Sequence, residues 1–231
     1  MTDNTGMPRI GLLVPASNTT MEWDFANWFA GRASVHTGRM LLREVTPEGE
    51  QEMLDVEARP AMQRVATVDP HVVVWGCTSA GSLHGADYDH RFRRDLSELG
   101  GGVPVIGVVD AVIARLEGVG RIGLLTPYVP ALTDRVADRL AEAGFSVAAR
   151  HSMGLSDNRE IGSVTPAQVR AAALTMDLTE AEALFVSCTN LRSMEAVAGI
   201  EDALGMMVTT SNLAAAQEAD RLARERAGAD R

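Results

Sequence analysis

The chain contains an internal duplication, which constrains its fold more than any other feature of the sequence. The segment Arg9–Pro15, with the letters RIGLLVP, returns as Arg121–Pro127, with the letters RIGLLTP. At almost the same interval after each copy, an apolar run ends in Cys-Thr, first at Cys77 and then at Cys188. These are the only two cysteines in the sequence. The repeat predicts two similar halves related by a pseudo-twofold axis, with the thiols facing each other across the cleft between them.

Short apolar runs bounded by Gly, Pro or Asp predict strands, and segments with apolar residues three and four apart predict helices. The strands are expected at Ile10–Val14, Val72–Trp75, Val105–Val108, Ile122–Leu125, Ala183–Val186 and Met207–Thr209. The helices are expected at Thr20–Ala30, Gly49–Val68, Arg91–Leu99, Asp110–Glu117, Pro130–Ala143, Pro166–Met176, Ser193–Leu204 and Leu213–Ala227. This alternation is typical of an α/β fold with a parallel sheet and helices on both faces.

The duplication also predicts the domain organisation. We expect an N-terminal half at residues 1–117 and a C-terminal half at residues 118–210, joined near Gly118–Gly120. The last helical segment, within residues 211–231, is the counterpart of the helix that ends the first half. We expect it to cross back and pack on the N-terminal half.

Composition and charge exclude several classes of function. The formal charge of −10 argues against nucleic acid as a partner, because phosphate binding needs a basic face. No apolar run reaches the roughly 18 residues of a membrane span, and the first residues lack the features of a signal peptide. We therefore expect a cytoplasmic protein that does not bind membranes and whose cysteines are reduced.

The residue types present also argue against a cofactor. All 21 basic residues are arginine, so no lysine can form a Schiff base with pyridoxal phosphate. No histidine stands at ligand spacing beside either cysteine, which argues against a zinc site. We expect neither a metal nor an organic cofactor.

Small polar residues directly follow four of the predicted strands. These segments are Pro15–Asn18, Gly76–Gly81, Thr126–Tyr128 and Ser187–Asn190. The carboxyl ends of parallel strands share one edge of the sheet, where α/β proteins bind ligands. Hydroxyl groups and open backbone N–H groups at helix starts suit an anion. The segments therefore predict a site for a small-molecule carboxylate.

These motifs make the chain resemble the aspartate/glutamate racemase superfamily. The resemblance is carried by the strand ending in Pro15-Ala-Ser-Asn-Thr-Thr-Met-Glu22, by the two Cys-Thr motifs, and by Thr126-Pro-Tyr128 at the start of the second half. Asp157–Gly162, with the letters DNREIG, makes the maleate cis–trans isomerase branch the most similar one. The resemblance runs over nearly the whole chain, about residues 8–225, and the motifs occur in the same order.

The resemblance implies two Rossmann-like or flavodoxin-like α/β/α halves with parallel sheets, an active site in the cleft between them, and no cofactor. Cys77 would be the nucleophile and Cys188 the opposing acid or base. The residues that the resemblance assigns to substrate binding are Asn18, Tyr128, Asn158, Thr78, Ser79 and Thr189. We also expect a homo-oligomer, either a dimer or a tetramer.

Departures from related branches bear on the reaction. Glutamate racemases have a histidine soon after the second Cys-Thr, where this chain has Asn190-Leu-Arg192. Arylmalonate decarboxylases have glycine at the first cysteine position, where this chain has Cys77. The run Ser187–Arg192 is also similar to relatives encoded in ectoine breakdown, which leaves the substrate open.

On maleate, the implied chemistry is covalent. The Cys77 thiolate would add to one alkene carbon and leave a single bond beside an enediolate, and rotation followed by expulsion of the thiolate would give fumarate. A helix expected after each Cys-Thr would favour the thiolate through its N–H donors and partial positive charge. Cys188 would hold or donate a proton.

Two other functions stay open. The same thiols could serve a two-base racemase of an amino acid or hydantoin-type substrate. The strand-end motifs contain no acidic partner for an α-ammonium group, which favours the isomerase. A small-carboxylate-binding protein without activity would not need both thiols.

Three of the candidate residues also have ordinary structural roles available. Asn18 could cap the following helix, Tyr128 could simply bury its ring, and Asn158 could belong to a turn. His84 and His90, which follow the first Cys-Thr, are expected at the surface.

Overall fold

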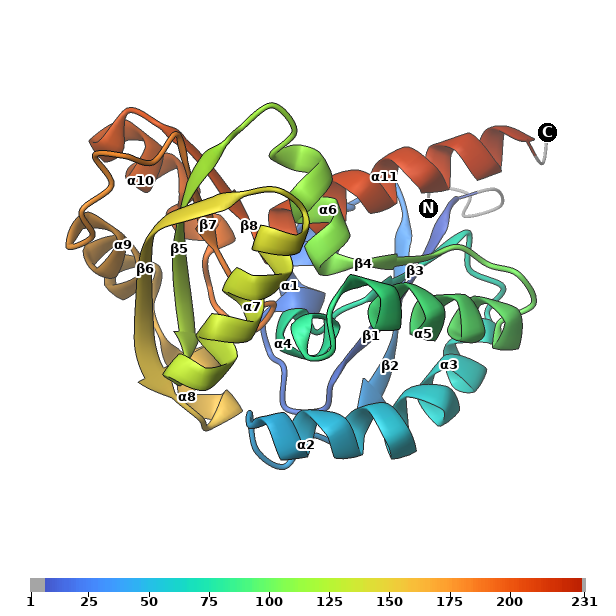
Figure 1. Cartoon of the computed structure of the whole chain (residues 1–231). Coiled ribbons are helices and arrows are strands. Elements are labelled where there is room, and N and C mark those ends of the chain that lie inside the picture. The colour runs from blue at the N-terminus through green and yellow to red at the C-terminus, as the bar shows by residue number, and fades with distance from the viewer. Residues whose placement is uncertain (1–6, 230–231) are drawn as a thin grey trace.

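The computed structural model describes residues 7–229 and contains two four-stranded parallel sheets. The strands are β1 (Arg9–Pro15), β2 (Ser34–Met40), β3 (Val72–Trp75), β4 (Val105–Gly107), β5 (Arg121–Tyr128), β6 (Ser146–Leu155), β7 (Ala183–Val186) and β8 (Met207–Thr210). Their order is β2-β1-β3-β4 in one sheet and β6-β5-β7-β8 in the other, so each strand has a counterpart. Figure 1 shows the second sheet on the left and the first on the right. The predicted α/β class is confirmed.

Helices connect the strands and cover the sheets. They are α1 (Met21–Trp28), α2 (Pro47–Glu52), α3 (Ala58–Ala66), α4 (Thr78–Ser82), α5 (Ala86–Leu99), α6 (Val108–Arg115), α7 (Pro130–Glu142), α8 (Asn158–Ser163), α9 (Pro166–Leu174), α10 (Val197–Leu204) and α11 (Ser211–Ala229). A π-helical segment, Met53–Glu57, joins α2 to α3, and a 3₁₀ turn, Met194–Ala196, precedes α10.

The sequence patterns did not predict the strands β2 and β6 or the short helices α4 and α8. β2 and β6 each lie at one edge of their sheets, and their half-exposed side chains do not form a continuous apolar run. By contrast, β3 and β7 are buried along their whole length and begin and end at the predicted residues. The helices α4 and α8 have five and six residues, too few to show an apolar period.

The C-terminal helix α11 packs on the first half, as expected. Its alanines Ala215, Ala216 and Ala219 are buried in one cluster with Ile10 and Leu12 of β1. Figure 1 shows this helix running across the first sheet next to α6. The division of the chain into halves between residues 117 and 118 stays a prediction. Residues 1–6 of the predicted N-terminal half and residues 230–231 of the predicted last segment lie outside the described part of the chain.

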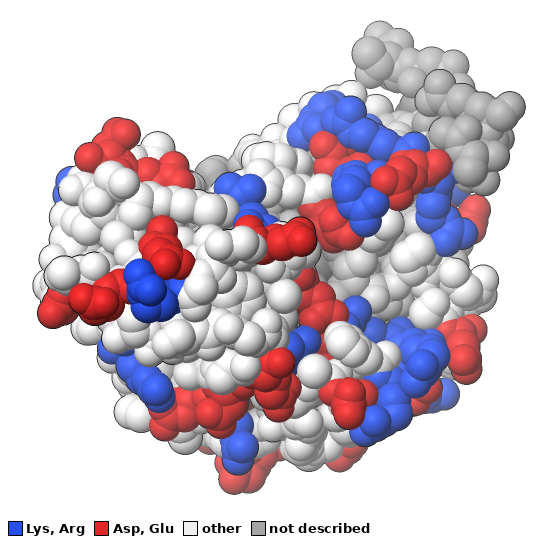
Figure 2. Space-filling model, turned by 45° about the horizontal axis from the view of Figure 1, so that its top comes forward, with Lys and Arg blue, Asp and Glu red and all other residues white. Residues whose placement is uncertain are grey.

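The surface is mixed in charge. Figure 2 shows acidic and basic side chains interspersed over the face in view. Within residues 7–229, no helix has the length and apolar character needed to cross a membrane.

The alanine face of α11 leads to a prediction about stability. Ala219 is fully buried, so Ala219→Leu forces extra methyl groups into a closed interface and should destabilise the protein by about 1–3 kcal/mol. Ala141 is exposed on α7, and Ala141→Leu should change stability by less than about 0.5 kcal/mol. Urea unfolding of both variants measures the difference. Equal stability of the two variants would contradict this packing.

Candidate active site

The two cysteines lie at equivalent positions of the two halves. Cys77 comes two residues after the end of β3, and Cys188 comes two residues after the end of β7. Both are buried free thiols, and both line one cavity between the sheets. The cavity is lined by Pro15, Asn18, Leu42, Val45, Glu50, Cys77, Thr78, Ser79, Tyr128, Asn158, Cys188, Thr189 and Asn190. All the residues that the sequence nominated are therefore brought together, while their chemical roles stay a prediction.

The cavity is nearly closed. The space that the centre of a water molecule can occupy within it is about 10 Å³, which is room for about one water molecule. A four-carbon diacid needs more space, so the wall of the cavity has to move before such a substrate can enter.

Hydrogen bonds across the cavity join the loops that carry the two cysteines. The Thr189 hydroxyl donates to the Gly76 carbonyl oxygen over 2.9 Å and accepts from Asn18 Nδ2 over 3.1 Å. Thr78 Oγ1 lies 3.0 Å from Ser211 Oγ, which accepts the backbone N–H of Cys188. Both threonine hydroxyls are thus engaged with protein atoms and hold the two halves in register.

Asn18 and Asn158 have structural partners in addition to their place in the cavity wall. Asn18 Oδ1 accepts the backbone N–H groups of Thr20 and Met21 at the start of α1, so its expected capping role is present. Asn158 Nδ2 donates to Ser17 Oγ over 2.8 Å. With the bond from Asn18 Nδ2 to Thr189 Oγ1, one amide proton of each asparagine is used, and the second is available among the described residues.

Asn190 was not nominated from the sequence, although it belongs to the second Cys-Thr segment. Its Nδ2 donates to Asn158 Oδ1 over 3.0 Å, and its Oδ1 accepts the backbone N–H of Thr19 over 2.9 Å. Its backbone N–H points at Cys188 Sγ over 3.3 Å. Asn190 therefore connects the first loop, α8 and the second thiol.

The surroundings of Cys188 differ from the sequence expectation of a helix start. A turn follows this cysteine, and Cys188 has a φ of 103°, which is costly for any residue other than glycine. Hydrogen bonds from Tyr128 and from the N–H groups of Asn190 and Leu191 lower the pKa of the thiol, but burial outweighs them and raises it to about 11. The expectation that a helix N-terminus favours this thiolate is wrong, because no helix begins there.

Cys77 does precede a helix, and its thiol is still held protonated. The N–H of Ala80 in α4 favours the thiolate. Burial, followed by the negative charge of Glu50, nevertheless raises the pKa of the Cys77 thiol well above its ordinary value. Burial likewise raises the pKa of the Tyr128 phenol. The helix N-terminus alone therefore does not activate Cys77.

Glu50 is a second cavity residue that was not identified from the sequence. Its side chain is fully buried, and its Oε2 accepts the Cys77 thiol proton over 3.2 Å. Its Oε1 accepts from the Ser79 hydroxyl. Desolvation raises the pKa of the carboxyl to about 7, although both hydrogen bonds lower it. The structure thus places an acid beside the cysteines, which the strand-end motifs did not contain.

Local sequence explains why α2 presents Glu50 to the cavity. Thr46 caps the helix by accepting the N–H of Gly49 over 3.2 Å, and Pro47 occupies the first turn. Glu50 then falls three and four residues before the buried Met53 and Leu54. An acid on the apolar stripe of a predicted helix is the signal that could have identified it.

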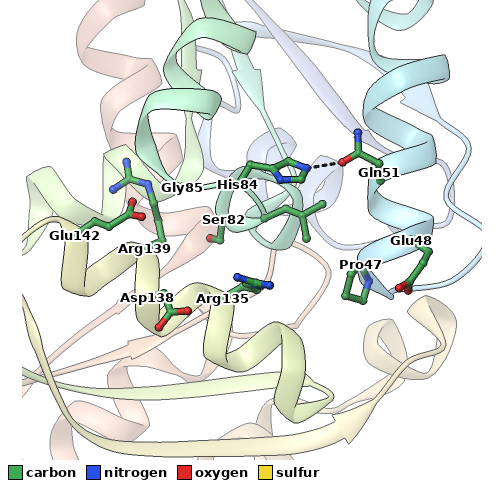
Figure 3. Close-up of a pocket in the computed structure, with 11 residues that line it drawn as sticks. Pro47, Glu48, Gln51, Ser82, His84, Gly85, Arg135, Asp138, Arg139 and Glu142 are labelled. Carbon is green, nitrogen blue, oxygen red and sulfur yellow. Dashed lines mark hydrogen bonds between the residues drawn. The ribbon is translucent and has the colours of Figure 1, made fainter.

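A larger pocket is also lined by residues of α2 and α4, although it shares no lining residue with the cysteine cavity. It has a volume of about 710 Å³ and lies between α2, the end of α4 and α7 (Figure 3). Its lining includes Pro47, Glu48, Gln51, Ser82, His84, Arg135 and Arg139. His84 is exposed, as expected, and its ring bonds the Gln51 side chain. The helix α2 therefore lines the larger pocket through Pro47, Glu48 and Gln51 and the cysteine cavity through Glu50.

The raised pKa of Glu50 predicts a pH-dependent effect on stability. In the folded protein the Glu50 carboxyl has a pKa of about 7, whereas its ordinary value is 4.5. The protonated carboxyl therefore contributes to the free energy of unfolding fully below about pH 4.5, and this contribution is lost as pH rises through about 7. Glu50→Gln is always neutral. It should match the wild type near about pH 4 and exceed it by up to about 3 kcal/mol near about pH 8 in urea unfolding. Glu52→Gln, at an exposed position, should show no such trend.

If the free energies of unfolding of Glu50→Gln and the wild type differ by the same amount at both pH values, the raised pKa of Glu50 is wrong.

Comparisons with known proteins agree with the geometry. A family model described as arylmalonate decarboxylase matches residues 10–230. The chain is 31% identical over 222 residues to a protein named maleate isomerase from Nocardia farcinica, covering 91% of this chain and 88% of that protein. It is 27% identical over 223 residues to arylmalonate decarboxylase from Bordetella bronchiseptica, covering 94% and 90% of the two chains.

A solved structure gives a similar result. The structure of a cysteine-to-serine mutant of Nocardia farcinica maleate cis–trans isomerase, with a covalently bound succinylcysteine intermediate, has a TM-score of 0.87 to this chain. The sequence identity is 29%, and the match covers 94% of this chain and 92% of that one.

Proposed function

The chain belongs to the arylmalonate decarboxylase family, and from that premise we propose that it is a cofactor-independent isomerase that converts maleate, or a close cis-enedioate, into the trans isomer. The observation that carries the proposal is the pair of reduced thiols, Cys77 and Cys188, in one enclosed cavity. The identity of 31% to the maleate isomerase from Nocardia farcinica, against 27% to arylmalonate decarboxylase, supports isomerisation. The presence of Cys77 also supports isomerisation. A decarboxylation leaves an enediolate that a single thiol can protonate, so it would not need a second cysteine in the cavity.

The proposed reaction has covalent addition as its first step. The Cys77 thiolate attacks one alkene carbon, and the π electrons move into the adjacent carboxylate to form an enediolate. The amides of Asn18 and Asn158 and the Tyr128 hydroxyl are the donors proposed to hold the substrate carboxylates. Rotation about the new single bond and expulsion of the thiolate then give the trans product, while Cys188 supplies or holds a proton.

A second candidate is a racemase of a substrate that carries an N–H group, and Glu50 favours it. The sequence analysis disfavoured this reaction because the strand-end motifs contain no acidic residue that could pair with an ammonium group. Glu50 supplies such an acceptor from α2, within 3.2 Å of Cys77 Sγ. Both candidates use the Cys77 thiolate, and they differ in whether it attacks carbon or removes an α-proton.

Two further expectations belong to this proposal. Reduced thiols are maintained in the cytoplasm, which is where we expect the enzyme to act. The predicted dimer or tetramer stays a prediction.

A proton NMR assay in D₂O distinguishes the candidate reactions. We expect purified protein without added cofactor to convert maleate to fumarate, since the vinyl protons of the two isomers give separate signals. The control is the Cys77→Ala variant under the same conditions. If deuterium enters the α-carbon of an amino acid or hydantoin while maleate stays unchanged, the protein is a racemase and the isomerase proposal is wrong.

Single-cysteine variants test the two-thiol reaction. Cys77→Ala and Cys188→Ala should each lower turnover by at least about a hundredfold while remaining folded. Ser187→Ala is the matched control, because the Ser187 hydroxyl is buried without a hydrogen-bond partner among the described residues and does not line the cavity. With Cys188→Ser and maleate, mass spectrometry should find one succinyl adduct on Cys77. Full turnover by either alanine variant would exclude the mechanism.

A further inference from the structure

The unexplained step in either candidate reaction is how Cys77 loses its proton. Its thiol is buried, and burial opposes the thiolate more strongly than the nearby N–H of Ala80 favours it. Cys188 offers no help, since its own thiol is also held protonated by burial. Some group within reach of Cys77 Sγ therefore has to accept the proton.

Glu50 has the geometry of that acceptor. The Cys77 thiol donates to Glu50 Oε2 over 3.2 Å, so the carboxyl oxygen is within hydrogen-bond reach of the proton that has to leave. The Ser79 hydroxyl donates to the other carboxyl oxygen and fixes the orientation of the group. A nucleophile, a base within hydrogen-bond reach and a third group that orients the base form the usual arrangement of an activated nucleophile.

The other groups that face Glu50 leave it free to act as a base near neutral pH. The titratable side chains that share its cavity are Cys77, Cys188 and Tyr128, all held neutral by burial, and the lining residues include no arginine or histidine. Without a cationic partner, burial raises the pKa of Glu50 to about 7. A base is most effective when its pKa lies near the working pH.

We propose that Glu50 is the general base that activates Cys77, an inference that rests on Cys77 being the reacting thiol. The Glu50 carboxylate takes the thiol proton, and the sulfur electron pair forms the bond to the substrate carbon. After rotation, the electrons of the enediolate return to form the alkene, the S–C bond breaks, and the thiolate takes its proton back from the Glu50 carboxyl. No other reactant is consumed in this cycle.

Alkylation of Cys77 by iodoacetamide tests the proposal without any substrate. Since the chain has two cysteines, Cys188→Ser leaves Cys77 as its single thiol, and the alkylation rate then reports on Cys77 alone. In this background the rate should rise with pH through about 7 and level off, following the ionisation of Glu50. Adding Glu50→Gln should remove this break and slow alkylation at neutral pH by about a hundredfold.

Two more variants complete the design. Glu50→Asp keeps a carboxylate with a shorter reach and should retain the break near neutral pH at a reduced rate. Glu52→Gln, on the exposed side of α2, should behave like its parent. Circular dichroism of each variant shows that it is folded.

The opposite outcome has a clear signature. If Glu50 only repels the thiolate through its charge, Glu50→Gln lowers the pKa of Cys77 and alkylation becomes faster; a faster or unchanged rate overturns the proposal. In the two-cysteine protein, Glu50→Gln should also remove the rise of maleate kcat/KM through about pH 7. If the wild type does not act on maleate, the proposed function fails, and the alkylation rates alone still decide the role of Glu50.

Discussion

The hydrogen bond from the Thr189 hydroxyl to the Gly76 carbonyl oxygen is the contact on which the site depends. It joins the residue after one cysteine to the residue before the other. The same hydroxyl accepts from Asn18, so the ends of β1, β3 and β7 meet at one atom. Because these polar groups are buried, loss of one partner would leave the others unsatisfied, which costs about 1–3 kcal/mol for each group. This network therefore helps to hold the two thiols in one cavity.

Burial sets the chemistry of the groups that this network encloses. Removal from water raises the pKa values of both thiols, of the Tyr128 phenol and of the Glu50 carboxyl, since in each case the charged form is the anion. Glu50 is shifted to a value where it can exchange a proton near neutral pH. Burial thus keeps both thiols protonated at rest, so the proposed reaction needs a nearby base.

The duplication has been modified where the two halves meet. Cys77 is followed by the helix α4, whereas Cys188 is followed by a turn and takes a positive φ. Glu50 lies beside Cys77, and the Tyr128 hydroxyl bonds to Cys188. Two cysteines at equivalent strand ends consequently have different partners. This difference agrees with unequal roles, one thiol adding to carbon and the other handling a proton.

Much of the architecture and most of the cavity wall could be predicted from local patterns. The buried strands β3 and β7 appear as apolar runs, and the repeat placed Cys77 and Cys188 at matching strand ends because parallel strands bring their carboxyl ends to one edge. Glu50, by contrast, lies outside the repeated sequence segments, and only tertiary packing turns it toward Cys77. The protonation states were likewise decided by the tertiary structure, because desolvation depends on everything that surrounds a group.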